Sequence, residues 1–230
     1  MTHLEEELHK LYLQMIDMAN LVTGQISKSI SAMIDADQDL AREVIFNEKR
    51  VNAYELKIDK DCENIFTLLN PFAQDMRFVF ATLKINYNFE RIGDNAEGIS
   101  HYVLLADKGF DKALLELCRF EQMAVTVNEM LADVTKAYID KDPKQARGVF
   151  QKDSILDVIN KSATDLSASY IRENPDNIMQ ALYLLTIIRK VERVGDHITN
   201  IAEEIIFYME AKVLKHGKKS HFFEEMDKPE

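Results

Sequence analysis

Two pairs of acidic residues with the same spacing are the first candidates for chemistry in this chain. Glu90 precedes Asp94 by four residues, and Glu192 precedes Asp196 by four. On a helix this spacing stacks two carboxylates on one face, where like charges are mildly destabilising. A single such pair is typical of a solvated helix face. Its recurrence at the same register in two similar segments favours a functional site.

A glycine occupies the same place in both pairs and completes the motif Glu-Arg-x-Gly-Asp. Gly93 and Gly195 lie in stretches with helical periodicity, where glycine costs about 1 kcal/mol relative to alanine. Because this cost occurs twice, we expect another group to approach the backbone closely at both positions. Tight packing against a neighbouring helix is the alternative, and the two explanations are compatible.

Acidic residues of a second helix could complete a cage in each half of the chain. Asp153 and Asp157 are four apart, and Glu48 and Asn52 occupy the equivalent places in the first half. Oxygen donors without thiolates favour Mg²⁺, Mn²⁺, Ca²⁺ or iron over structural zinc. The spacing therefore predicts divalent or multinuclear metal ions, with Mg, Mn, Fe and Zn all open. A solvated face on a plain helical scaffold remains the alternative.

The count of carboxylates differs between the two halves. The second half offers four and the first three, with neutral Asn52 in the fourth place, so we expect tighter metal binding in the second half. Arg91 and Arg193 point off the acidic face and are expected to pair with the ligands. No phosphate-binding loop or nucleophile motif occurs, and no catalytic residue is predicted. Further candidate ligands on the same helices are Glu97, His101, Asn200 and Glu203.

An internal repeat relates the two halves. Residues 31–48 match residues 136–153 at an offset of 105, and residues 90–99 (ERIGDNAEGI) match residues 192–201 (ERVGDHITNI) at an offset of 102. Two matches in the same order at nearly the same offset indicate a tandem duplication.

Few helix breakers interrupt the chain, which has only seven Gly and four Pro. Asn70, Asp142 and Asn174 each precede a proline, which predicts an N-cap followed by the first helical residue. Short turns between long helices imply antiparallel neighbours and an all-α fold of two tandem homologous three-helix bundles. We expect helices near 4–35, 38–69, 72–106, 111–141, 143–173 and 175–214, in repeats 1–107 and 108–216, followed by a flexible tail at 217–230.

Composition excludes several classes of function. A formal net charge of −11 argues against nucleic-acid binding, which requires a basic face. The N-terminus lacks the apolar core of a signal peptide, and the longest apolar run, near 181–188, is too short to span a bilayer. Cys62 and Cys118 lack ligand spacing and are interpreted as buried free thiols. These features predict a cytoplasmic protein without membrane insertion.

The chain resembles the PhoU family of phosphate-specific transport system accessory proteins over roughly residues 12–208. The resemblance rests on Asn70-Pro71-x-x-x-Asp75-Met76-Arg77, on the Glu90–Asp94 motif, and on the segment from Val191 through Glu203. It implies paired three-helix bundles and a regulatory, non-enzymatic role. It also implies that Glu90, Asp94, Glu192 and Asp196 bind metal ions, with Glu48, Asp153 and Asp157 in the companion motif.

The resemblance also implies partners. PhoU proteins restrain a phosphate ABC transporter and a phosphate-sensing histidine kinase when phosphate is plentiful, so we expect an adaptor between the two and a homodimer. Its acidic face would meet basic cytoplasmic loops of the membrane partners. The alternative is a carboxylate-bridged metal-storage or redox bundle, which needs paired Glu-x-x-His motifs. Only Glu6 and His9 supply that spacing.

Overall fold

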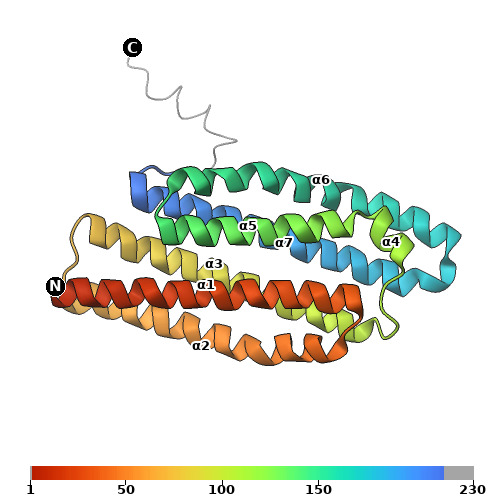
Figure 1. The fold of residues 1–230 in the computed structure, drawn as a ribbon, viewed down its shortest axis with the longest axis horizontal. Coiled ribbons are helices and arrows are strands. Elements are labelled where there is room, and N and C mark those ends of the chain that lie inside the picture. Colours follow the sequence, from red (N-terminus) through yellow and green to blue (C-terminus); the bar gives the residue numbers. More distant parts are fainter. Residues whose placement is uncertain (1, 215–230) are drawn as a thin grey trace, which may run out of the picture.

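The computed structural model describes residues 2–214, and regular structure in that part of the chain is helical. Figure 1 shows long rods packed side by side, which confirms the all-α fold. The predicted tail at 217–230 lies outside the described residues. The elements are α1 (His3–Asp35), α2 (Gln38–Leu68), α3 (Gln74–Leu105), α4 (Lys112–Leu117), α5 (Phe120–Asp140), α6 (Pro143–Glu173), the 3₁₀ turn η1 (Pro175–Asn177) and α7 (Ile178–Glu210).

Equivalent turns join the first and second helices of each repeat. Ala36 ends α1 and Lys141 ends α5, each in the left-handed conformation. Asp37 and Asp142 follow, and the side chain of each accepts hydrogen bonds from the first backbone amides of the next helix. These local signals fix the ends of four helices by capping chemistry alone. The predicted cap at Asp142, with Pro143 in the first turn, is confirmed.

The expected caps before the third helices are wrong. Asn70 and Ala73 both have positive φ, and α3 begins only at Gln74 without a side-chain cap. Asn174 precedes the short turn η1, so α7 starts three residues later than Pro175. In both places the proline belongs to a connecting turn before the helix.

The predicted helix at 111–141 is broken into α4 and α5. Arg119 adopts a positive φ of 53° between them, although neither Gly nor Pro marks the position. Cys118 and Phe120 are both fully buried, yet residues two apart lie on opposite sides of a continuous helix. The left-handed residue turns both side chains into the core.

The two halves share one hydrophobic core. In Figure 1, α3 and α7 lie between the outer helices α2 and α6. Aromatic pairs join α3 and α7 at opposite ends, with ring centroids 5.2 Å apart for Phe78 and Tyr208 and 5.6 Å apart for Tyr102 and Tyr183. The two helices are therefore antiparallel, as expected for repeats related by a local two-fold axis.

The first helices of the repeats also meet. The Tyr12 hydroxyl donates to the Ile139 carbonyl at 2.9 Å, and Ser27 Oγ donates to Asn128 Oδ1 at 2.6 Å. Cys62 and Cys118 are buried free thiols, as predicted, and burial raises the pKa of Cys62 to about 12. Among the described helices, none combines the length and apolar character needed to cross a bilayer.

Candidate functional site

The motif glycines bring the second helix of each repeat against the third. A Cβ on Gly93 would lie 2.9 Å from Val51 Cγ1, and one on Gly195 would lie 2.6 Å from Leu156 Cδ1. The tight-packing explanation is therefore confirmed. In the second repeat the same Cβ would lie 2.9 Å from Asp153 Oδ1, so the glycine also seats this carboxylate against α7.

Glu90 is the most perturbed carboxylate of the first repeat. Its side chain is only 12% exposed, and burial, followed by repulsion from Asp94, raises its pKa to about 7. Arg91 opposes this shift more weakly. Although Arg91 Nε lies 3.3 Å from Glu90 Oε2, that oxygen is buried and forms no hydrogen bond. Such an oxygen is suited to accept a further cation.

Glu55 belongs to the same cluster and was missed by the sequence analysis. Burial, then Asp59, raises its pKa, and Asp94 also contributes. The buried Glu48, whose pKa is raised by burial and then by Glu97, lies seven residues earlier on α2. The signal was present, because residues seven apart share a helix face. The first cluster therefore has four carboxylates rather than three.

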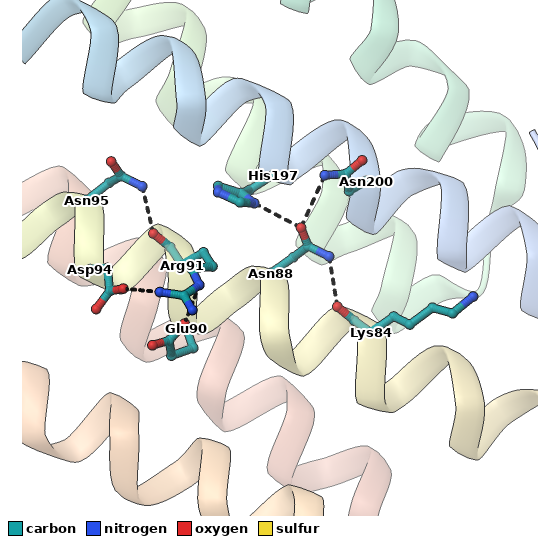
Figure 2. A network of polar contacts seen from close by, with 8 residues as sticks. All are labelled: Lys84, Asn88, Glu90, Arg91, Asp94, Asn95, His197 and Asn200. Atoms are coloured by element: carbon teal, nitrogen blue, oxygen red, sulfur yellow. Dashed lines mark hydrogen bonds and ion pairs between the residues drawn. The ribbon is translucent and has the colours of Figure 1, made fainter. Parts of the chain in front are cut away.

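Arg91 is an ion-pair partner of the cluster, as expected. Its Nη1 donates to Asp94 Oδ2 at 2.9 Å, and Figure 2 shows the guanidinium between Glu90 and Asp94. The guanidinium also lies 5.1 Å from the centroid of the Tyr87 ring. Arg91 thus supplies positive charge to the first cluster.

The second cluster repeats this arrangement on α6 and α7. Burial, then Asp196, raises the pKa of Glu192, and Asp157 adds to the rise while Asn160 and Arg193 oppose it. Asn160 is equivalent to Glu55 at the repeat offset of 105. Each cluster therefore offers four carboxylates and one neutral amide, but the amide lies at a different place, Asn52 in one and Asn160 in the other.

The additional candidate metal ligands lie in different parts of the molecule. His101 Nε2 lies 3.6 Å from Glu97 Oε1. Because the charge of Glu97 raises the pKa of Glu48, this pair extends the first cluster. Asn200 instead donates to Asn88 Oδ1 across the contact between α3 and α7, at 3.3 Å. Glu203 is half-buried one turn further along α7.

Asn88 is a buried polar residue that the motif did not reveal as a link between repeats. Its amide nitrogen donates to the Lys84 carbonyl at 2.8 Å, so its oxygen accepts from His197 Nδ1 at 2.9 Å (Figure 2). His197 therefore links α7 to α3. Burial, then Arg91, lowers its pKa, which favours the neutral ring.

The carboxylates fit a hard cation chemically but are not drawn together around one point. Within residues 2–214, no three His, Cys, Asp or Glu side chains lie close enough to hold one ion. A divalent cation would stabilise the ionised forms of these carboxylates. It would lower the raised pKa values of Glu48, Glu55 and Glu192 and would give the buried Glu90 Oε2, which has no hydrogen bond, a further partner. Binding would require side-chain rotation to bring the oxygens together.

Comparison with known proteins identifies the family. The PhoU domain model matches residues 15–103 and again residues 120–205. The phosphate-specific transport system accessory protein PhoU of Escherichia coli K12 is 31% identical over 210 residues, which cover 91% of this chain and 86% of that protein. A PhoU homologue from Burkholderia is 28% identical, covering 92% and 91% of the two chains.

Two crystal structures have the same fold. PhoU from Pseudomonas aeruginosa superposes with a TM-score of 0.85 at 29% identity, covering 90% of this chain and 99% of that chain. The phosphate transport system regulatory protein PhoU from Streptococcus pneumoniae gives a TM-score of 0.80 at 27% identity, covering 92% and 99%. With two matched domains, the duplicated motif and this shared fold, the chain belongs to the PhoU family.

Proposed function

We propose that this protein is a non-enzymatic regulator of phosphate uptake and of phosphate-starvation signalling. It acts in the cytoplasm as a metal-binding adaptor between a phosphate ABC transporter and a sensor histidine kinase. The observation that carries the proposal is the pair of equivalent acidic clusters in a chain of the PhoU family. Relatives named as phosphate transport accessory proteins support the link to phosphate transport.

The residues that would hold metal are the four carboxylates of each cluster. A bound divalent ion supplies positive charge that offsets their mutual repulsion and links the second helix of a repeat to the third. The strongest support is Glu90, whose buried oxygen lacks a hydrogen bond. The sets are Glu48, Glu55, Glu90 and Asp94 in the first repeat, and Asp153, Asp157, Glu192 and Asp196 in the second.

The charge of the protein fits the proposed partners. At −11 it favours basic surfaces and disfavours nucleic acid and anionic lipid. The cytoplasmic loops of membrane proteins are rich in Lys and Arg, so a transporter or kinase supplies such a surface. A homodimer remains part of the proposal.

Nothing in the described residues favours the storage or redox alternative. Glu6 and His9 lie in the first turns of α1, and His9 stacks with Tyr12. A carboxylate-bridged di-metal centre needs such a motif on two helices that face each other in the core.

Deleting the gene tests the regulatory role. A reporter of phosphate-scavenging genes should become active in phosphate-rich medium, and a plasmid copy of the gene should restore repression. A reporter that stays repressed in the deletion strain would contradict the proposed function, whatever metal the protein binds.

A further inference from the structure

Four large apolar side chains are exposed along the first half of α3 and in the turn before it. Phe72 is 84% exposed, Met76 39%, Phe80 47% and Tyr87 50%; we call this row the α3 stripe. The last three lie on one face of α3, because their spacings of four and seven match the helical period. Phe66 of α2 supports the row, with its ring centroid 4.8 Å from that of Phe80. Single exposed apolar residues are ordinary, but several on one helix face mark an interaction surface.

Carboxylates border the α3 stripe on its α2 side. Of the cations near the stripe, Arg77 follows Met76 and is half-buried, while Lys84 Nζ lies 3.0 Å from Glu204 Oε2 and Arg91 pairs with Asp94. On the α2 side, Asp59 accepts from Asn86 Nδ2 at 2.9 Å. Asp59, which is not among the proposed metal ligands, has no ion pair within residues 2–214.

The second repeat keeps only part of the row. At the offset of 102, Ile178 and Leu182 replace Met76 and Phe80 and are 41% and 45% exposed, while Asn174 replaces Phe72. The exposed Arg189 replaces Tyr87, which puts a cation where the first repeat has an aromatic ring. A basic partner would meet an aromatic ring at this point of the first repeat and a cation at the same point of the second.

We propose that the α3 stripe is a docking surface for an amphipathic helix whose apolar face is flanked by Lys and Arg, supplied by a protein partner. The inference rests on the proposed function and names the adaptor surface and its partner chemistry. A second copy of this chain would bring two acidic borders together, and an anionic membrane would be repelled by the same carboxylates. A basic amphipathic helix would cover the exposed apolar side chains with its apolar face and pair its Lys and Arg with the acidic residues beside them.

Binding of synthetic helices measures this directly. The probe is a fluorescent Leu/Lys amphipathic helix of about 18 residues, or about five turns, at an ionic strength of about 0.15 M. The control probe replaces every Lys by Glu. We expect the Leu/Lys helix to bind and the Leu/Glu helix not to bind. Phe80→Gln should weaken binding by about tenfold, because it removes half-exposed aromatic surface from the contact.

Leu182→Gln is the matched control, with nearly equal exposure at the equivalent position. It should leave binding unchanged, and Phe72→Gln, in the turn before α3, repeats the test if Phe80→Gln fails to fold. Equal losses at Phe80 and Leu182 would overturn the inference. So would a dimer that Phe80→Gln converts to a monomer, or binding to phosphatidylserine vesicles that requires Phe80, since either would assign the stripe to another occupant.

Complementation of the deletion strain separates this inference from the proposed function. If deletion activates the phosphate reporter and the Phe80→Gln and Phe72→Gln proteins both restore full repression, the docking surface is wrong while the regulatory role stands. If deletion leaves the reporter repressed, the proposed function itself fails. The supporting result is repression restored by wild type and Leu182→Gln but not by the stripe variants.

Discussion

Replacing Glu90 by glutamine should stabilise the metal-free protein at pH 8. The carboxylate is 12% exposed, and burial, then Asp94, raises its pKa from the usual 4.5 to about 7. Each tenfold change in proton affinity corresponds to about 1.4 kcal/mol, so ionising Glu90 in the folded protein costs up to about 3 kcal/mol. Glutamine keeps the shape of the protonated acid and removes this cost.

The effect should depend on pH in a defined direction. Because the folded-state pKa is raised, the contribution of Glu90 to stability is fully present below about pH 4.5 and is lost as pH rises through about 7. Glu90→Gln should therefore melt about 5–10 °C above wild type at pH 8. The difference should shrink toward zero near pH 4.5.

Thermal melts of protein stripped of metal by a chelator test this reasoning. Glu63→Gln is the control, because Glu63 is 62% exposed in an ion pair with Lys60 and should change stability by less than about 1 kcal/mol. Adding Mn²⁺ at pH 8 should raise the melting temperature of wild type more than that of Glu90→Gln. A Glu90→Gln protein that is less stable than wild type at pH 8 without metal would refute the proposed free-energy cost of ionising Glu90 in the folded protein.

Two further substitutions test the packing and the ligand set. Gly195→Ala should lower the free energy of unfolding by about 1 kcal/mol, since crowding of the buried Leu156 outweighs the gain in helix propensity. Gly148→Ala, with no atom within 4 Å of the added Cβ, should raise the free energy of unfolding by about 1 kcal/mol. Equal effects of the two substitutions in denaturant unfolding would contradict the packing argument. Glu55→Gln should weaken Mn²⁺ binding to the first repeat as Asp94→Asn does, whereas a calorimetric titration identical to wild type would remove Glu55 from the site.

The sequence alone was enough to predict most of the helices, the duplication and the acidic motif. These features depend on interactions over a few residues: the Asp142 cap bonds to the next amides, and Glu90 and Asp94 share a face because of the helical period. The offset between repeats also aligns Gly93 with Gly195. Local chemistry of this kind is readable without knowing which helices meet.

Tertiary packing decided the features that depend on a second helix. The helical period places Glu55 on the same face as Glu48, but only the packing of α2 against α3 at Gly93 brings it to the Glu90–Asp94 motif. Asn88 became a buried link because α7 places His197 opposite it. The break at Arg119 has no local signal, since it arises from burying Cys118 and Phe120 in one core. Each of these outcomes is set by which faces the assembled helices cover, and that depends on all of them together.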